Sequence, residues 1–227
     1  MEIASIDEIT QTFESASPQD VIAWAVGRFR GELALACSFG GPSGLALVDM
    51  LAQIDPTVPV YYLDTGLLFA ETYAHVEAVA KRYGIRPIAV RPKLSVEEQA
   101  RQYGAALWER DPDACCGLRK VEPQRDFLQG YSAWISGIRR DQSSSRSRVH
   151  VVERDKFGLI KVNALATWTE EMVWAYVHAH DVPYNPLLER GYRSIGCTHC
   201  TLPVAEGEAP RAGRWRGFAK TECGLHA

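Results

Sequence analysis

The chain has 227 residues, 46% of them hydrophobic, and a formal net charge of −3, which suits one α/β domain with a sizeable core. This acidic balance argues against a general nucleic-acid coat. The first residues, MEIASIDEIT, lack the basic start and apolar run of a secretory signal, and no run of about 18 apolar residues follows, so we expect no membrane span and a cytoplasmic location.

In the first half of the chain, short apolar runs alternate with helical patterns. SPQDVIAWAVGRF predicts a helix with Ser17 as N-cap and Pro18 in its first turn. ELALACSFGGPSGLALVDML predicts a strand ending at Cys37, a glycine loop and a helix. VPVYYLDTG and IRPIAV predict two more strands, separated by a helix that stops at Gly84. A capping box in SVEE predicts another helix starting near Ser95.

The second half begins regularly and ends irregularly. LRKVEPQRDFL predicts a helix interrupted at Pro123, and YSAWISG predicts a fourth strand. SRVHVVERDKFGLIKVN predicts a hairpin, and TWTEEMVWAYVHAH a helix capped by Thr167. After Pro183 little periodicity remains. We therefore predict a single domain over residues 1–227, with a parallel sheet covered by helices on both faces, an N-terminal helical segment over about 1–30 and an irregular C-terminal segment.

Two features suggest that the chain binds an anion. The loop SFGGPSG, Ser38–Gly44, follows a strand and opens a helix, so its backbone N–H groups and the helix N-terminus favour phosphate or sulfate. Residues 115–148 carry seven Lys/Arg and three Asp/Glu, a net charge of +4, and the arginines that we expect to clamp an anion are Arg139, Arg140, Arg146 and Arg148. A tight turn and a solvated basic surface remain the structural alternatives.

The six cysteines are too sparse for a disulfide-stapled secreted scaffold, and their spacing points to a metal centre or redox chemistry. Cys197 and Cys200 have the two-residue spacing that lets both thiolates face one metal centre. Cys115 and Cys116 are adjacent, which is awkward for one tetrahedral zinc but suits a polynuclear iron-sulfur cluster. Structural zinc and a redox dithiol at the spaced pair remain alternatives.

The other two cysteines have different settings. Cys37 ends an apolar strand, and we interpret it as a small core residue. Cys223 lies near the C-terminus, with Lys220 and His226 within three residues on either side. An exposed thiol in a cationic setting is a candidate nucleophile. A leftover surface thiol is the alternative.

These motifs together resemble one family, the bacterial assimilatory sulfonucleotide reductases of the iron-sulfur type, which reduce adenosine 5′-phosphosulfate. The resemblance runs from about Ser38 to the C-terminus, through SFGG, LDTG, CCGLRKVEP, SGIRRDQS, PYNPL, RGYRSIGCTHCTLPV, GRW and ECGLH. It implies a fold like that of the adenine-nucleotide α-hydrolases, which is related to the PP-loop pyrophosphatases.

The resemblance also implies roles for individual residues. Cys115, Cys116, Cys197 and Cys200 match the ligands of a [4Fe-4S] cluster, and Cys223 matches a nucleophile that forms an S-sulfocysteine. That intermediate would be reduced by thioredoxin or a glutaredoxin-like dithiol, releasing sulfite. Lys120, Arg146, Arg211 and Arg214 match positions that hold the phosphosulfate, whereas Ser38, Leu63 and Gly137 match positions that line the nucleotide. His226 matches a position close to the nucleophile, and residues 203–227 would form a mobile tail.

Several departures keep alternatives open. Leu67 and Leu202 stand where the family often has basic residues, and Gly40 where a serine is frequent. The 3′-phosphorylated substrate, or both substrates, therefore remains an alternative. A tRNA-thiolating enzyme is a more distant one, because the loop lacks the full signature of ATP-cleaving relatives and the chain lacks a broad basic surface. We expect neither a nucleic-acid nor a membrane partner, and a homo-oligomer is left open.

Overall fold

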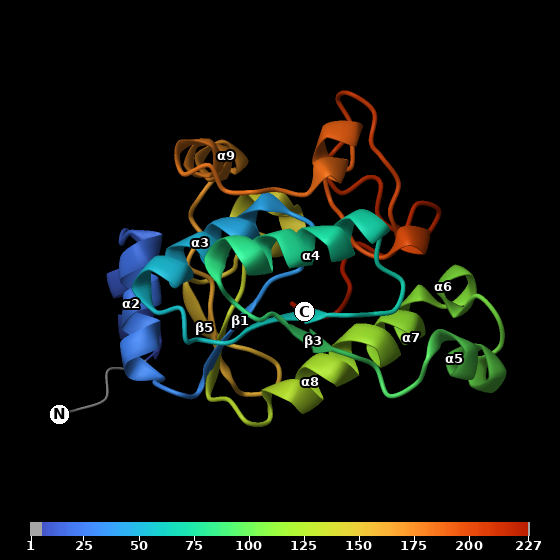
Figure 1. Cartoon of the computed structure of the whole chain (residues 1–227), viewed down its shortest axis with the longest axis horizontal. Helices are drawn as coiled ribbons and strands as arrows, with labels where there is room; N and C mark the ends of the chain where they lie inside the picture. The colour runs from blue at the N-terminus through green and yellow to red at the C-terminus, as the bar shows by residue number, and fades with distance from the viewer. Residues whose placement is uncertain (1–5, 227) are drawn as a thin grey trace.

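The computed structural model describes residues 6–226, which form a six-stranded sheet with helices on both faces (Figure 1). The strands are β1 (Leu33–Ala36), β2 (Val60–Leu63), β3 (Ile88–Val90), β4 (Ala133–Ile135), β5 (Val152–Arg154) and β6 (Ile160–Val162). Their order is β3-β2-β1-β4-β6-β5, and all neighbours are parallel except β5 and β6. The predicted α/β class is confirmed, and the predicted hairpin supplies the antiparallel edge.

The helices of the described residues mostly begin and end where local signals predict. They are α1 (Ile6–Phe13), α2 (Pro18–Arg28), α3 (Pro42–Ile54), α4 (Ala70–Tyr83), α5 (Val96–Tyr103), α6 (Leu107–Arg110), α7 (Pro112–Cys116), α8 (Glu122–Leu128) and α9 (Glu170–Ala179). Ser17 caps α2, Ser95 forms a capping box with Glu98, and Gly84 ends α4 in the left-handed conformation.

The predicted cap of α9 is wrong by two residues. Thr169, and not Thr167, is the N-cap, and its side chain accepts a hydrogen bond from the backbone N–H of Met172. The chain is still turning at Thr167, because the N–H of Trp168 donates to the carbonyl of Leu165. The helix therefore begins two residues later than its sequence pattern predicts.

The predicted interruption at Pro123 is also wrong. A π-helical segment, η1 (Gly117–Val121), joins α7 to α8, so the helical path continues from the adjacent cysteines to Leu128. Pro123 lies in the first turn of α8, where a proline is tolerated. The extra residue of a π turn changes which side chains share a helix face, and such turns are frequent at functional sites.

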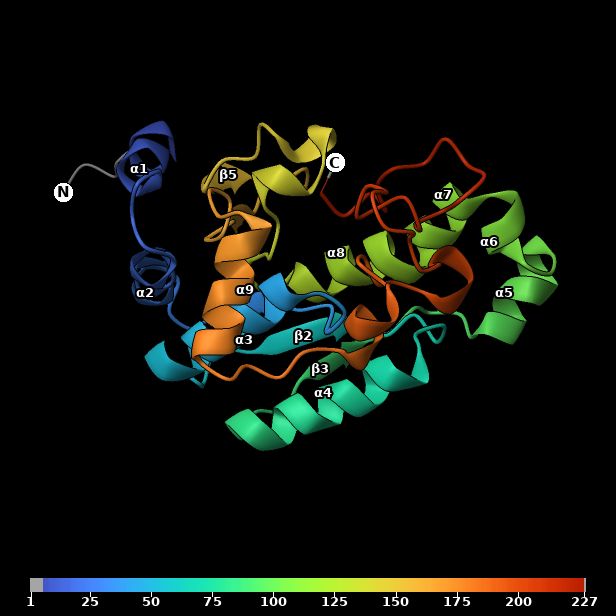
Figure 2. The ribbon, with the colours of Figure 1, turned by 90° about the horizontal axis from the view of Figure 1, so that it is seen from above.

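Alternate residues of the central strands bury their side chains on opposite faces of the sheet. Leu33 and Leu35 of β1 belong to the large core beneath α2, α3, α4 and α9, whereas Ala34 belongs to a second core beneath α8. Tyr61 of β2 and Trp134 of β4 also lie on the α8 face. Figure 2 shows α4 and α8 on opposite sides of β2 and β3. This arrangement is expected for a parallel sheet covered on both faces.

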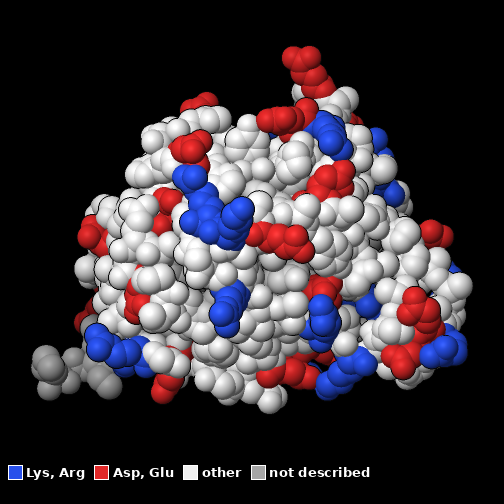
Figure 3. Space-filling model, in the orientation of Figure 1, with Lys and Arg blue, Asp and Glu red and all other residues white. Residues whose placement is uncertain are grey.

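The surface and the helix lengths add two observations. On the face seen in Figure 3, basic and acidic side chains are interspersed, so this face has no broad basic area of the kind that binds nucleic acid. No helix within residues 6–226 is both long enough and apolar enough to cross a membrane.

Candidate active site

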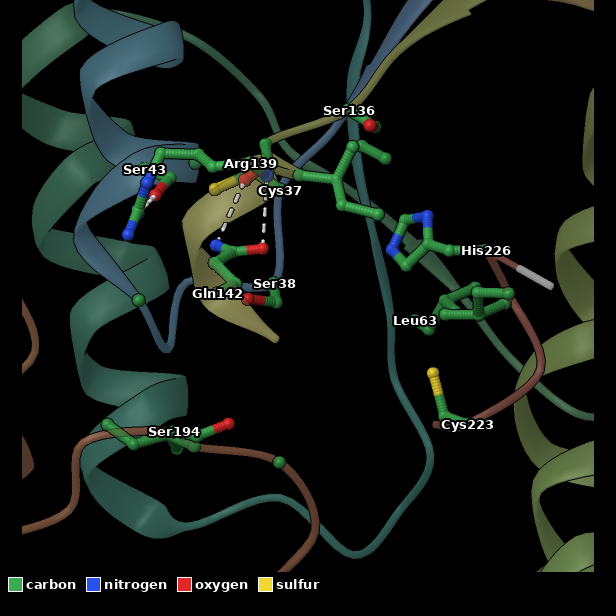
Figure 4. A pocket seen from close by; sticks show the side chains of 18 of the residues that line it. Cys37, Ser38, Ser43, Leu63, Ser136, Arg139, Gln142, Ser194, Cys223 and His226 are labelled. Atoms are coloured by element: carbon green, nitrogen blue, oxygen red, sulfur yellow. Dashed lines mark hydrogen bonds between the residues drawn. The ribbon is translucent and has the colours of Figure 1, made fainter. Parts of the chain in front are cut away.

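A pocket of about 280 Å³ lies at the carboxyl ends of β1, β2 and β4, where ligands bind in open α/β sheets. It is the place where the sequence-predicted residues meet. The predicted residues that line it are Ser38, Leu63, Lys120, Gly137, Arg146, Arg211, Arg214, Cys223 and His226. Figure 4 shows the side chain of Cys223 entering the pocket from the C-terminal segment, beside Leu63.

The glycine loop forms one wall of this pocket. Gly41 is the N-cap of α3 and makes no side-chain cap bond, so the first N–H groups of the helix are left for another partner. A Cβ atom on Gly137 would lie 3.1 Å from the backbone nitrogen of Gly44, so the chain just after β4 approaches α3 closely at a position that favours glycine. Gly40 packs against Ile195, where a Cβ atom would lie 2.9 Å from the Cβ of that residue.

The predicted arginine clamp forms only in part. Arg139 and Arg146 line the pocket, but Arg140 and Arg148 do not. Arg140 instead donates two hydrogen bonds to the carboxylate of Glu14, and Arg148 is exposed. The prediction of four clamping arginines from this segment is therefore wrong, because two of them point to other parts of the surface.

The C-terminal segment supplies the remaining cationic side chains of the site and one carboxylate, Glu222, that was not predicted from the sequence. Arg211 and Arg214 line the pocket opposite Arg146. Between Arg146 and Arg211 lies Glu222, which accepts hydrogen bonds from both. Burial and the neighbouring charge of Arg146 lower the pKa of Arg211 to about 10. Glu222 directly precedes Cys223 in the sequence, and this position is the signal that could have identified it as a residue of the site.

The four cysteines with expected cluster roles do not line the pocket; they lie at the end of α7 and around the short 3-10 helix η5 (Thr198–Cys200). Cys115, Cys116 and Cys197 are buried and Cys200 is partly buried. Burial and then the neighbouring thiols Cys116 and Cys197 raise the pKa of Cys115, and burial and Cys197 raise that of Cys200. The two pairs, distant in sequence, are therefore neighbours in the fold.

Lys120 connects these cysteines to the pocket. It is 8% exposed and lines the pocket. Burial opposes ionisation of the Cys197 thiol, but the charge of Lys120 leaves the pKa of that thiol below its ordinary value. Burial disfavours the charged form of Lys120, yet the negative charge of Cys197 and then Cys223 leaves the pKa of Lys120 above the ordinary value. A buried ammonium group whose partners are thiols suits an anionic centre at this place.

The donor set consists of four cysteine thiols, the ligand type of iron-sulfur clusters. In the described part of the chain, no group of three or more His, Cys, Asp or Glu side chains could hold one metal ion. Thiolates that bind different irons of one cluster need not converge on a single point. Buried second-layer groups are also in place, since the Gln99 side-chain amide contacts the sulfur of Cys115 and accepts a hydrogen bond from Arg119.

Leu67 and Leu202, the departures that replace basic residues of the family pattern, lie outside the pocket lining. Leu67 pairs through its backbone carbonyl with the N–H of Thr198, which places it beside the CxxC segment. Leu202 is 49% exposed. These two substitutions therefore do not change the walls of the pocket, because neither residue forms part of them.

The tail beyond Cys223 packs onto the α8 face of the sheet. His226 stacks on Trp134 with ring centroids 5.9 Å apart, and its Nδ1 is buried with no hydrogen-bond partner among residues 6–226. Burial, and then the charge of Lys161, holds the pKa of His226 well below its ordinary value. Lys156 donates a hydrogen bond to the carbonyl of Gly224. These contacts hold the end of the chain against the pocket.

Three further polar atoms are buried and have no partner within the described part of the chain, and they belong to pocket-lining residues: Tyr61 Oη, Gln124 Nε2 and Trp215 Nε1. Sequence reasoning missed all three residues. Gln124 follows Lys120 by four positions along the same helical path, a spacing that could have indicated a shared face. Unpartnered polar groups in a pocket are expected to bind water or a ligand. By contrast Cys37 is buried, and burial raises its pKa to about 12, which confirms it as a core residue.

Comparison with known proteins identifies similar sequences over nearly the whole chain. A profile of the phosphoadenosine phosphosulfate reductase domain matches residues 32–203. The adenosine 5′-phosphosulfate reductase of Halalkalibacterium halodurans is 46% identical over 224 residues, covering 98% of this chain and 96% of that protein. The corresponding enzyme of Geobacillus thermodenitrificans is 49% identical over 215 residues, covering 94% and 91%. The phosphoadenosine 5′-phosphosulfate reductase of Gloeobacter violaceus is 45% identical over 227 residues, covering 98% and 94%.

Solved structures agree with the fold. The phosphoadenylyl-sulfate reductase of Candida auris, in a phosphate complex, is 36% identical with a TM-score of 0.77, covering 89% of this chain and 99% of that chain. The FMN adenylyltransferase of Candida glabrata, in complex with FAD and inorganic pyrophosphate, is 15% identical with a TM-score of 0.61, covering 93% and 73%, and shares the fold alone. The predicted relation to PP-loop-like nucleotide-binding folds is confirmed.

Proposed function

Because this chain belongs to the phosphoadenosine phosphosulfate reductase family, as the domain match and the extent of its identity to the relatives show, we propose that it reduces adenosine 5′-phosphosulfate to sulfite and AMP. The observation that carries the proposal is Cys223, a thiol placed in a pocket lined by Lys120, Arg146, Arg211 and Arg214. A thiol nucleophile and an anion-binding cationic wall are the two requirements for sulfonate transfer to cysteine.

The reaction is proposed to proceed in two displacements. The thiolate of Cys223 attacks the sulfonate sulfur, the bond between that sulfur and the bridging oxygen breaks, and AMP leaves with the electron pair. The product is an S-sulfocysteine. A dithiol of the thioredoxin or glutaredoxin type then attacks the Cys223 sulfur, sulfite leaves, and the second thiol of that partner resolves the mixed disulfide. The partner is thereby oxidised by two electrons, which balances the reduction of the sulfonyl sulfur to sulfite.

The residues of the pocket have separate tasks in this proposal. Arg146, Arg211 and Arg214 bind the phosphosulfate and stabilise the charge that develops on the leaving phosphate. The N-terminus of α3 and its loop, with Ser38 and Gly137, border the nucleotide together with Leu63. His226 helps to hold the tail, and so keeps Cys223 in reach of the substrate. The chain of residues 1–227 acts as one domain, with residues 203–227 as its moving part.

The four cysteines Cys115, Cys116, Cys197 and Cys200 are proposed to hold a [4Fe-4S] cluster. When bound, such a cluster would supply negative charge beside the substrate site and no electrons for the reaction. Lys120, which lines the pocket and whose charge acts on the Cys197 thiol, would connect the two sites electrostatically. Six free thiols are consistent with a reducing compartment, and we propose the cytoplasm.

A second substrate has support of its own. The Gloeobacter violaceus and Candida auris relatives carry names that refer to the 3′-phosphorylated nucleotide. We therefore propose the unphosphorylated substrate first and the 3′-phosphorylated one as the alternative. The ratio of kcat/KM for the two nucleotides, measured on the same preparation, decides between them.

The test is mass spectrometry of the reduced, anaerobically purified protein mixed with adenosine 5′-phosphosulfate and no dithiol partner. We expect one sulfonate adduct on the peptide that contains Cys223, and its loss when thioredoxin is added. Cys223→Ser should form no adduct and produce no sulfite, yet keep its iron and sulfide, because no cluster ligand is removed. Cys116→Ser should lose iron. Wild-type protein with full iron content and no adduct would contradict the mechanism.

A further inference from the structure

We propose that Glu222 is a positioning residue: its carboxylate occupies Arg146 and Arg211 when the pocket is empty, and the anionic group of the substrate must replace it there. Docking of the tail through Glu222 and binding of that anion therefore exclude each other. The identity of the anion rests on the proposed function, but the competition itself rests only on the geometry of the pocket.

The contacts of Glu222 are those of a bound anion. Arg146 donates from Nε to one carboxylate oxygen and from Nη2 to the other, both at 2.7 Å. Arg211 donates from Nη2 at 3.1 Å, and the hydroxyl of Ser145 at 3.2 Å. The two-point pairing with Arg146 is the geometry by which arginine binds carboxylate or phosphate. An incoming phosphate or sulfate group needs the same donors.

The pairing is well formed and partly shielded from water. The side chains of Arg146, Arg211 and Glu222 are 11%, 18% and 15% exposed. Burial opposes ionisation of Glu222, but its hydrogen bonds to Arg146 and the charges of Arg146 and Arg211 leave its pKa below the ordinary value. The tail therefore docks through a charged carboxylate under neutral conditions.

The two carboxylates that line the pocket itself, Asp141 and Glu170, are paired with other cations. Asp141 pairs with Arg139, and Glu170 pairs with Arg193. Both belong to the body of the fold, whereas Glu222 belongs to the segment that carries the nucleophile. Exchange of Glu222 for a substrate anion would thus leave the wall intact and release the tail.

Displacement of the Glu222 carboxylate would affect the neighbouring residue, Cys223. Cys223 is partly buried in this docked arrangement, and it follows Glu222 directly in the chain. When an anion takes Arg146 and Arg211, the Glu222 carboxylate loses its partners and the backbone that carries the thiol is freed to move. The substrate would in this way control the position of the nucleophile that attacks it, and the empty enzyme would keep that thiol covered.

The experiment compares wild type with Glu222→Gln and a matched control, Glu208→Gln. Glu208 pairs with Arg216 at the surface of the same C-terminal segment and does not line the pocket. Three quantities are measured on cluster-loaded protein: the Kd of AMP and of inorganic sulfate by calorimetry, the rate of iodoacetamide alkylation at the Cys223 peptide, and kcat and KM separately.

For Glu222→Gln we expect anion binding and Cys223 alkylation to rise about 3- to 10-fold, since removing a competitor raises the fraction of free clamp. KM should fall while kcat stays close to that of wild type, because in the substrate complex the Glu222 carboxylate has already left Arg146 and Arg211. In wild type, sulfate should accelerate alkylation at constant ionic strength, whereas chloride should not; in Glu222→Gln sulfate should add no acceleration. Glu208→Gln should match wild type in every measurement.

Weaker or unchanged sulfate binding in Glu222→Gln would overturn the proposal, because it would mean that Glu222 supports the arginines instead of competing for them. The same conclusion follows if sulfate fails to accelerate alkylation of wild type, a measurement that needs no variant and holds even if Glu222→Gln does not fold. Failure of the proposed function is a separate result: no sulfite would form from adenosine 5′-phosphosulfate, whatever the alkylation rates.

Discussion

His226 is a neutral side chain in a cationic setting. Its ring stacks on Trp134 of β4, and the charges that depress its pKa come from Lys161 of β6, Arg146, Arg211 and Lys156. Glu222, which lies between two of these arginines, keeps its charge in the same pH range, because its pKa is below its ordinary value of 4.5. Protonation of the docked ring would add a further positive charge to this group. Docking of the tail therefore requires the neutral imidazole.

The first prediction is a pH dependence of tail docking. Because the pKa of docked His226 lies well below 6.5, an undocked tail takes up the proton first, so docking is complete above about pH 6.5 and weakens as the pH falls. Opening should increase about tenfold for each pH unit below that value, until the pKa of the docked form is reached. Hydrogen exchange of residues 218–226, corrected for intrinsic rates, measures it.

His226→Gln is the control for that pH effect. Glutamine keeps a polar side chain of similar length but takes up no proton in this range. The exchange rates of its tail should therefore change little between about pH 7.5 and 5.5 after correction. An equal pH response in wild type and His226→Gln would show that another group controls docking.

At the scale of elements, local signals decide what the sequence can predict. Ser17, Ser95 and Gly84 mark helix ends through contacts within a few residues, and all three were predicted correctly. The π segment η1 was not predicted, because the contacts that favour it are long-range. It places Lys120 between the cysteines and the pocket, and no local signal reports those contacts. The cap at Thr169 failed for a related reason: a preceding turn delays the start of α9.

Asp49 illustrates a second element-scale feature that hydrophobic patterns conceal. It lies in the apolar stretch of α3 and is 5% exposed. Its carboxylate accepts hydrogen bonds from Tyr83 at the end of α4, from Tyr176 of α9 and from Gln53. One buried charge therefore ties three helices together on the same face of the sheet. Buried carboxylates persist where hydrogen bonds of this kind satisfy them.

The second prediction concerns this network. Asp49→Asn should lower the free energy of unfolding by about 2–3 kcal/mol, because the amide nitrogen meets hydroxyl donors and the charge-assisted bonds are lost. Tyr176→Phe should cost about 1 kcal/mol. Urea denaturation gives both values, and anion affinity should not change, since Asp49 does not line the pocket.

Tyr184→Phe is the matched control, since its hydroxyl donates to Glu189 in an exposed position. That change should cost less than about 0.5 kcal/mol. The network would have no special role if Asp49→Asn proved no more destabilising than Tyr184→Phe.

At the scale of the whole molecule, the site was predictable from the sequence only through its motifs. The strand ends predicted where a ligand would bind, and the resemblance named nine residues that the structure brings to one pocket. The contacts that close the pocket could not be predicted from the sequence. The pair of Arg146 and Glu222 joins residues 76 positions apart, and no periodicity or spacing signals such a contact. Sequence reasoning accordingly expected a mobile tail and overlooked the carboxylate that docks it.

The N-terminal helix performs a second long-range task. The strand β5 ends the sheet, and α1 lies against it, where the hydroxyl of Thr10 donates to the carbonyl of Val152 in a buried position. Glu14, just past the end of α1, pairs through two hydrogen bonds with Arg140. The apolar residues of α1 that pack on the core are Ile6, Ile9 and Phe13. The helix therefore covers an edge that would otherwise be open to pairing with another chain.

The third prediction follows from that cover. Removal of residues 1–13 should lower the free energy of unfolding by about 3 kcal/mol through lost apolar burial, and it should cause concentration-dependent association, because the β5 edge is exposed. Thr10→Val, which keeps the cover but loses one hydrogen bond, should cost about 1 kcal/mol and cause no association beyond that of the full chain. Sedimentation velocity at several concentrations and urea denaturation measure both effects. Sulfate affinity should be unchanged by the truncation, since the pocket is built from residues after Leu35. A truncated chain that is as stable as the full chain, and associates no more than it does, would show that α1 is not the cover of this edge.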